Sequence, residues 1–166
     1  RVLFRSNIDA LMEASAGNLS ARYEAALNQL EAAEQAEWHR VAARMKTICA
    51  AAAEKKTGVL VDAEETWIQD PVDALTMDMM KTYNRDVAIV YNTVQLYRHD
   101  RLAFLKTCHD AAVKDNFLLA VKLVRGAYME KERKRAEEKG YPSPIQPDIT
   151  HTHRDYNEAE IGRAHV

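Results

Sequence analysis

Short apolar segments alternate with longer amphipathic ones over the second two thirds of the chain. The apolar segments are Val59–Val61, Val87–Gln95 and Leu118–Gly126, and each ends near polar or small residues. Apolar runs of this length, bounded by turn residues, are typical of buried strands in a parallel sheet. The segments that follow them have helical spacing: Trp67–Tyr83, Arg101–Lys114 and Tyr128–Lys139.

The first third of the chain has a helical pattern. Asn7–Lys56 is rich in good helix formers, with one glycine and no proline. Within it we expect a helix at Asn18–Leu30 and a long amphipathic helix at Ala33–Lys56. Spacings of three and four place the following residues of the second helix on one face: Trp38, Val41, Met45 and Ile48.

The strands and helices alternate with a period of about 30 residues, which fits the repeating unit of a (β/α) barrel or of a doubly wound sheet. No G-x-G-x-x-G motif follows a strand, which argues against a dinucleotide-binding domain. We therefore predict an α/β fold in which residues 57–160 form part of a (β/α)8 TIM-like barrel, about three parallel βα units, and residues 7–56 form a helical segment leading into it.

Composition narrows the class of protein. The 166 residues include 23 basic and 25 acidic side chains, a balance that gives no reason to expect a nucleic-acid partner. No apolar run approaches the length of about 20 residues that a membrane span needs. The two cysteines, Cys49 and Cys108, lie in helical patterns. We therefore expect each to pack as a small apolar residue of a helix, and we expect no disulfide.

The two ends have an unusual relation. RVLFRS at residues 1–6 and IGRAHV at residues 161–166 can be encoded by DNA sequences that are reverse complements of each other. This relation is typical of a translated sequencing-library adaptor on both sides of an insert. We therefore leave both ends out of the fold prediction and expect the rest to be an internal piece of a longer protein.

Polar side chains stand at the carboxyl ends of all three predicted strands: Asp62, Gln95, Lys122 and Arg125. Parallel neighbouring strands would bring them to one rim, where barrels bind their ligands. A lysine in a strand is costly to bury without compensation. The residues alone leave two explanations of Lys122 open: a ligand contact, or a structural role in which the side chain snorkels to water or pairs with a neighbouring carboxylate. Asp62 likewise either accepts hydrogen bonds from a ligand or caps the next helix.

This set of donors and acceptors contains no nucleophile with an activating base. His151 and His153 alternate in a segment that we expect to be a loop, which is only a weak hint of a metal site, and we predict no metal. Such a rim suits cofactor binding better than hydrolysis, because a cofactor then supplies the chemistry.

Three motifs in order carry a resemblance to a known family. They are VLVDAEETWIQD at Val59–Asp70, VYNTVQLYRHDR at Val90–Arg101, and VKLVRGAYMEKER at Val121–Arg133, the last followed by GYPSPIQP. Together they resemble the flavin-binding core of proline dehydrogenases. The resemblance implies oxidation of L-proline to Δ1-pyrroline-5-carboxylate, FAD as the cofactor and a quinone as the electron acceptor. It also implies a peripheral membrane location, on the matrix side of the mitochondrial inner membrane in a eukaryote or in the cytoplasm or at the inner membrane in a bacterium.

The resemblance also implies roles for individual residues. Asp62 and Gln95 would hydrogen-bond the flavin system, and Lys122 would lie near its reactive edge. Tyr128 would face the substrate. The isoalloxazine and ribityl chain would be lined by Arg125, Gly126 and Ala127. We accordingly predict Lys122 and Tyr128 as catalytic residues, and the other five, with Lys122, as cofactor-binding residues.

The chain departs from the family in two ways. Many members have Arg at the position of Lys122 and Lys at that of Arg125. The residues that bind proline's carboxylate in the family, a lysine on an earlier strand and two arginines on the last helix, have no counterpart here. Two other functions stay open at this point: a class I aldolase-like barrel that uses Lys122 as a Schiff-base amine, and a non-catalytic α/β binding module.

Overall fold

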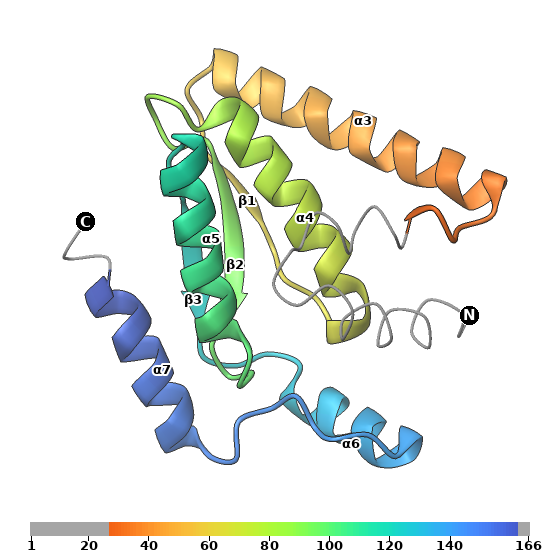
Figure 1. The fold of residues 1–166 in the computed structure, drawn as a ribbon, viewed down its shortest axis with the longest axis vertical. Coiled ribbons are helices and arrows are strands. Elements are labelled where there is room, and N and C mark those ends of the chain that lie inside the picture. Colours follow the sequence, from red (N-terminus) through yellow and green to blue (C-terminus); the bar gives the residue numbers. More distant parts are fainter. Residues whose placement is uncertain (1–26, 163–166) are drawn as a thin grey trace.

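The chain folds into a three-stranded sheet with helices packed against it (Figure 1). The structure is a computed structural model that describes residues 27–162. The predicted helix Asn18–Leu30 lies mostly outside these residues, as do residues 1–6 and 163–166. The elements are α3 (Ala32–Glu54), β1 (Val59–Val61), α4 (Thr66–Tyr83), β2 (Val90–Gln95), α5 (Arg101–Asp115), β3 (Val121–Val124), α6 (Met129–Lys139) and α7 (Ile149–Gly162).

The sheet confirms the predicted topology. Its strands lie in the order β1-β2-β3, and both pairs are parallel. Val59 is paired with Val90, and Asn92 is paired with Val121. Each connection between strands contains one helix, as a parallel crossover requires. The carboxyl ends of all three strands therefore meet at one edge of the sheet.

Strands β2 and β3 each begin three residues later than predicted, and Asn84 bonds the segments that lead into them. Its fully buried side chain accepts hydrogen bonds from the backbone N–H groups of Ile89 and Val90, at 2.9 and 2.8 Å. It donates to the carbonyl oxygens of Val90 and Leu118, at 2.8 and 3.0 Å. One side chain thus bonds backbone groups of Ile89 and Leu118, in the segments that lead into β2 and β3, and of Val90, the first residue of β2.

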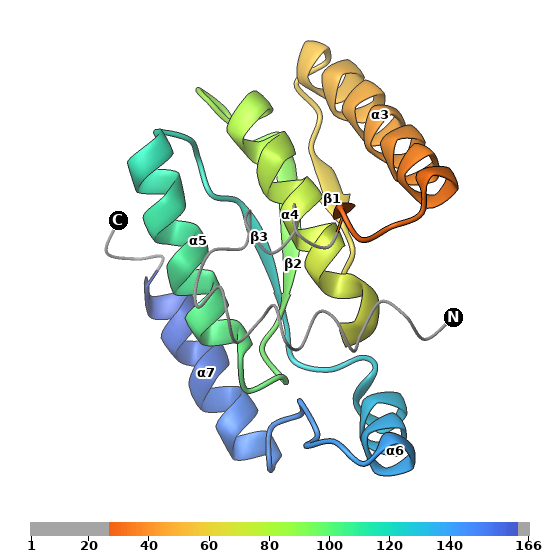
Figure 2. The same cartoon turned by 45° about the vertical axis from the view of Figure 1, so that its right-hand side comes forward.

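The prediction that all three strands are buried is wrong for two of them. Only β2, the central strand, is largely buried, whereas every residue of β3 is half-buried and Leu60 of β1 is 55% exposed. Within the described part of the chain, α4 and α5 pack on one face of the sheet (Figure 2). Among the described residues, β1 and β3 are the two edge strands of the sheet, so they are less covered than the central strand.

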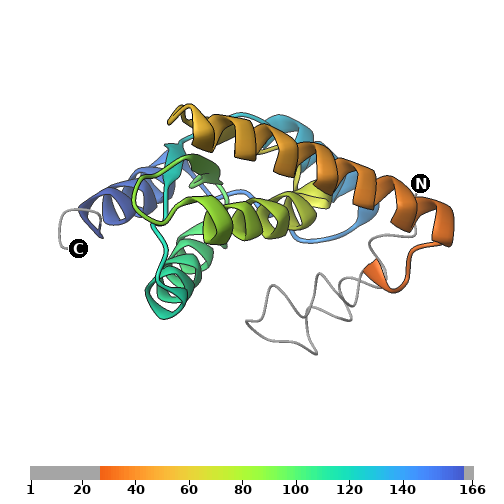
Figure 3. The same cartoon turned by 90° about the horizontal axis from the view of Figure 1, so that it is seen from above.

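Helix α3 packs along α4 (Figure 3). Trp38, Val41 and Met45 contact the core as predicted, but Ile48 is 58% exposed, and Cys49 is buried in its place. At about 100° per residue, Cys49 lies roughly 20° from the direction of Trp38, whereas Ile48 lies about 80° away. Both cysteines are free and buried, and burial raises the pKa of the Cys108 thiol to about 12.

A buried ion pair joins the helices to the sheet. The Asp73 carboxylate of α4 is 0% exposed and accepts a bond from Arg101 Nη2 of α5 at 2.7 Å. Its other oxygen accepts bonds from Gln69 at 3.0 Å and from Asn92 of β2 at 2.7 Å. Three donors surround this carboxylate, as a charge removed from water requires.

Gly140 ends α6 in the left-handed conformation, at φ 69°, and the proline-rich segment Tyr141–Pro147 contains no helix, as predicted. Helix α7 then lies beside α5. Within residues 27–162, no helix is both long and apolar enough to cross a membrane.

We expect Asn84→Ala to lower the free energy of unfolding by about 3 kcal/mol, because it leaves several buried backbone groups without partners. Urea denaturation measures this change. Asn157→Ala, on the exposed side of α7, is the control and should change stability by less than about 0.5 kcal/mol. Equal effects of the two substitutions would contradict the role of Asn84.

Candidate functional site

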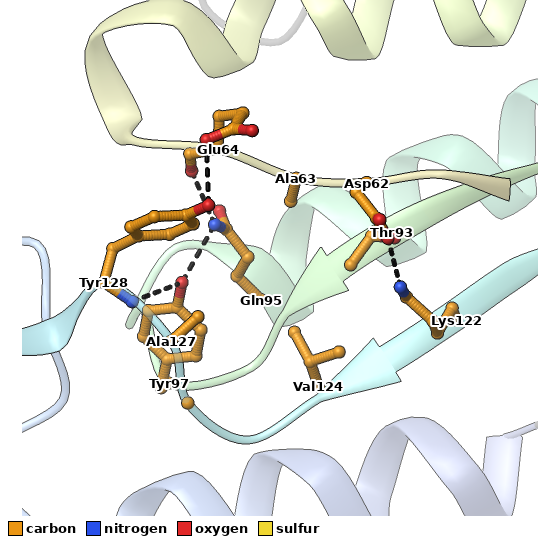
Figure 4. A pocket seen from close by; sticks show the side chains of 11 residues that line it. Asp62, Ala63, Glu64, Thr93, Gln95, Tyr97, Lys122, Val124, Ala127 and Tyr128 are labelled. Carbon is orange, nitrogen blue, oxygen red and sulfur yellow. Dashed lines mark hydrogen bonds and ion pairs between the residues drawn. The ribbon is translucent and has the colours of Figure 1, made fainter.

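A pocket of about 250 Å³ opens at the carboxyl edge of the sheet, where barrels and open α/β sheets hold their ligands (Figure 4). Residues of β2, of β3 and of the segments that follow the three strands line it. They are Asp62, Ala63, Glu64, Thr93, Gln95, Tyr97, Lys122, Val124, Gly126, Ala127 and Tyr128. The prediction that Asp62, Gln95 and Lys122 meet at one edge is therefore confirmed.

Lys122 and Asp62 form an ion pair across the sheet. Lys122 is in register with Thr93 of β2, so its side chain reaches over the central strand to Asp62, just beyond β1 (Figure 4). The Lys122 side chain is 38% exposed, and a pair this open to water adds little to stability. Asp62 does not cap α4, since Glu65 occupies the N-cap position.

Gln95 is held by three neighbours. Its amide nitrogen donates to the Glu64 carbonyl oxygen at 2.6 Å and to the Tyr97 hydroxyl at 2.9 Å. Its amide oxygen accepts a long bond from Arg98 at 3.4 Å. The side chain is therefore fixed in orientation at the base of the pocket.

Tyr128 lies across the pocket from the strands and donates its hydroxyl to Glu64 Oε2 at 2.8 Å. This bond to a carboxylate raises the pKa of Tyr128, because loss of the proton would place two negative charges side by side. Its backbone N–H points to the Tyr97 hydroxyl at 3.5 Å. Burial raises the pKa of Tyr97 as well, so both phenols stay neutral hydrogen-bonding groups at neutral pH.

Gly126 and Ala127 form the turn between β3 and α6 and line the pocket as small residues. A side chain added at Gly126 would place its Cβ 3.1 Å from Met129 Sδ, a tight contact. Packing against Met129 therefore gives one structural reason for a glycine there.

Arg125 does not join the other three polar residues, which corrects the prediction that all four converge. Its guanidinium lies 3.8 Å above the ring of Tyr156 in α7, and Nη1 is 3.3 Å from His153 Nδ1. Arg125 does not line the pocket. The prediction did not include helix α7, which holds Arg125, and therefore did not foresee this direction.

His151 and His153 lie in helix α7, and the prediction of a loop there is wrong. Asp148 precedes the helix, and its carboxylate accepts the backbone N–H of His151 at 3.0 Å, which is typical of a helix N-cap. The His151 ring also bonds this carboxylate and holds the pKa of Asp148 below its usual range. Among residues 27–162, no group of three or more His, Cys, Asp or Glu side chains could hold a metal ion.

Glu64 and Tyr97 are pocket residues that sequence reasoning did not single out. Tyr97 follows Gln95 by two positions, and the alternation of a strand continued to this point places both on one face. For Glu64, only its closeness to Asp62 was a signal, because its partners Gln95 and Tyr128 lie 31 and 64 positions further along the chain.

Comparison with known proteins identifies the family. The family model described as proline dehydrogenase matches residues 4–160. The mitochondrial proline dehydrogenase 1 of Drosophila melanogaster is 39% identical over 126 residues, which cover 76% of this chain and 18% of the relative. The carbapenem biosynthesis protein CarD of Pectobacterium carotovorum is 44% identical over 105 residues, or 63% of this chain and 28% of the relative. The chain thus spans less than a third of these curated relatives.

Solved structures agree on the fold. Proline utilization A (PutA) of Bdellovibrio bacteriovorus, inactivated by N-propargylglycine, matches with a TM-score of 0.68 and 20% identity, over 74% of this chain and 13% of that chain. PutA of Bradyrhizobium japonicum matches with a TM-score of 0.59 and 22% identity, over 72% of this chain and 12% of that chain. The described elements are thus part of a barrel of this type, as predicted. The chain belongs to the proline dehydrogenase family.

Proposed function

We propose that the protein containing this chain oxidises L-proline to Δ1-pyrroline-5-carboxylate with FAD as its cofactor. The observation that carries the proposal is the pocket at the carboxyl edge of three parallel strands, which joins Asp62, Gln95, Lys122 and Tyr128. Membership of the proline dehydrogenase family supports it. The proposal concerns the longer protein, because this chain matches only 18% and 28% of two relatives.

The residues of the pocket suit a flavin. An ammonium group, a fixed amide and two neutral phenols surround a hollow whose turn carries small residues, Gly126 and Ala127. FAD held in this pocket would supply the hydride acceptor for the oxidation of the proline ring carbon next to the nitrogen, and in our proposal a quinone would be the final electron acceptor. The protein binds and orients both partners and supplies charge where it is needed.

Lys122 supplies the positive charge. In this chain Asp62 holds the Lys122 ammonium over Thr93, so the charge has a fixed place at the rim of the pocket. A fixed cation stabilises negative charge that develops beside it. Gln95 provides an oriented amide, and Tyr128 provides a hydroxyl on the side from which we expect the substrate to enter.

The aldolase alternative fits the pocket less well. A Schiff-base lysine needs a desolvated setting in which the neutral amine is favoured. Lys122 is 38% exposed and paired with a carboxylate, so it does not have such a setting. If borohydride fails to trap a carbonyl compound on the protein, this result would support the conclusion that Lys122 is not a Schiff-base lysine.

Location and substrate range follow from the relatives as proposals. The Drosophila relative, and others from Arabidopsis thaliana and Homo sapiens, are named as mitochondrial. We propose the mitochondrial inner membrane, matrix side, for a eukaryotic protein and the cytoplasm or inner membrane for a bacterial one. A Xenopus laevis relative that is 38% identical is named hydroxyproline dehydrogenase, so hydroxyproline belongs in every substrate test.

The full-length protein tests the proposal directly. We expect the purified protein to carry a flavin absorbance spectrum that bleaches when L-proline is added without oxygen. Hydroxyproline and D-proline serve as comparison compounds. A protein without a flavin spectrum would support the non-catalytic binding module and reject our proposal.

In the full-length enzyme, we expect Lys122→Met to lower the limiting rate of flavin reduction about a hundredfold while proline binding changes less. A donor aimed at developing charge acts on the transition state and contributes roughly 3 kcal/mol. Rapid-mixing measurement of flavin bleaching against proline concentration separates the rate from the affinity.

The control is Lys106→Met, which removes an exposed lysine paired with Glu158 far from the pocket. It should leave both quantities unchanged. A normal limiting rate in Lys122→Met, with only the apparent affinity for proline reduced, would show that Lys122 binds substrate and does not act on the hydride transfer.

We expect the 166-residue chain, made alone, not to reduce a redox dye in the presence of proline. The residues that clamp proline's carboxylate in the family have no counterpart in it, and among residues 27–162 strands β1 and β3 each pair on one side only. Steady-state dye reduction by the purified chain, beside the full-length protein as a positive control, is the measurement. Proline-dependent turnover by the short chain would disprove this expectation.

A further inference from the structure

Glu132 of α6 bonds the start of a distant helix. Its side chain is 1% exposed, and its carboxylate accepts the backbone N–H of Thr66 at 2.6 Å and the Thr66 hydroxyl at 2.9 Å. Thr66 is the first residue of α4, whose N-cap residue Glu65 makes no side-chain cap bond. A helix start needs acceptors for its free N–H groups and favours a negative charge. Glu132 meets both needs from 66 positions away.

A second bond joins the same two segments. Tyr128 lies one turn before Glu132, whose backbone N–H donates to the Tyr128 carbonyl oxygen at 2.9 Å. The Tyr128 hydroxyl donates to Glu64, two residues before Thr66. The first turn of α6 is therefore tied at two points to the connection between β1 and α4. Two separated bonds fix the orientation of the two segments, whereas one bond would allow rotation about it.

Glu132 is the buried member of this contact. Lys131 also bonds Glu65, and the Arg135 guanidinium lies 4.2 Å above the Trp67 ring, but the Lys131 side chain is 61% exposed. Water can replace an exposed ion pair at little cost. Water reaches the buried Glu132 carboxylate less easily, and loss of this carboxylate would leave the half-buried N–H and hydroxyl of Thr66 without their partner.

We propose that Glu132 is a positioning residue that holds Tyr128 in the pocket by tying the first turn of α6 to the start of α4. The proposal rests on the proposed function in one respect, since it assigns to Tyr128 the binding of proline. The tie itself is a statement about the fold and is tested without turnover.

The test uses the full-length, FAD-loaded protein in four forms: wild type, Glu132→Ala, Tyr128→Phe and the double variant. We expect Glu132→Ala to raise the KM for proline about tenfold, the factor for the loss of one charge-assisted hydrogen bond. In the Tyr128→Phe background the same change should raise KM much less, because the positioned hydroxyl is already gone. Hydrogen–deuterium exchange should become faster at residues 126–130 in Glu132→Ala, with strand β2 unchanged.

Two further variants keep the test decisive. Thr66→Val removes only the hydroxyl bond to Glu132 and should raise the KM for proline and the exchange rate at residues 126–130 by smaller factors. This variant tests the proposal if Glu132→Ala does not fold. Glu130→Ala, at an exposed position of the same helical turn, is the control and should match wild type.

Additive effects of Glu132→Ala and Tyr128→Phe on KM, or unchanged exchange at residues 126–130, would overturn the proposal. A wild-type protein that does not oxidise proline would instead reject the proposed function. The exchange measurement alone would then decide whether Glu132 ties α6 to α4.

Discussion

The structure depends on one buried charge, the Asp73 carboxylate. Water cannot reach it, so protein donors must replace its hydration, and each of the three donors comes from a different place: Gln69 in α4, Asn92 in β2 and Arg101 in α5. A carboxylate that loses such partners costs several kcal/mol. The requirement to surround Asp73 therefore fixes how α4 and α5 sit on the central strand, in a way that apolar packing alone does not specify.

The same constraint extends to the pocket through Gln69. Its amide donates to Asp73, so its oxygen is oriented towards the chain that enters α4, where it accepts the Glu64 backbone N–H at 2.8 Å. Glu64 in turn receives Gln95 at its carbonyl oxygen and Tyr128 at its carboxylate. Two residues of the predicted site, Gln95 and Tyr128, thus bond to Glu64, whose backbone N–H is held by the core residue Gln69. Bonded polar groups of the core therefore lie directly beneath the rim of the pocket.

The sequence predicted what depends on local pattern. Apolar runs and turn residues placed three strands and the helices between them, and the polar residue near each strand end placed Asp62, Gln95 and Lys122 at one edge. The bonds of Glu132 to Thr66 and of Tyr128 to Glu64 were not predictable, because no periodicity links residues that are 66 and 64 positions apart. The direction of Arg125 depends on α7, whose start at Asp148 was a readable signal that the prediction did not use. The pattern also failed to show that Cys49, and not Ile48, faces the core. Spacings of three and four do not resolve the small difference in the directions of these two residues around the helix axis.

The exchange of lysine and arginine relative to the family resemblance has a physical explanation in their partners. At position 122 the side chain must cross β2 and end on a single carboxylate, which a long, flexible stem with a compact charge does well. At position 125 the group lies flat over Tyr156 and also reaches a ring nitrogen of His153. A planar guanidinium stacks on an aromatic face and donates in its own plane, which an ammonium cannot do. Each cation therefore suits its own surroundings. Helix α7 holds Arg125 away from the pocket, and Lys122 is the cation among the residues that line it.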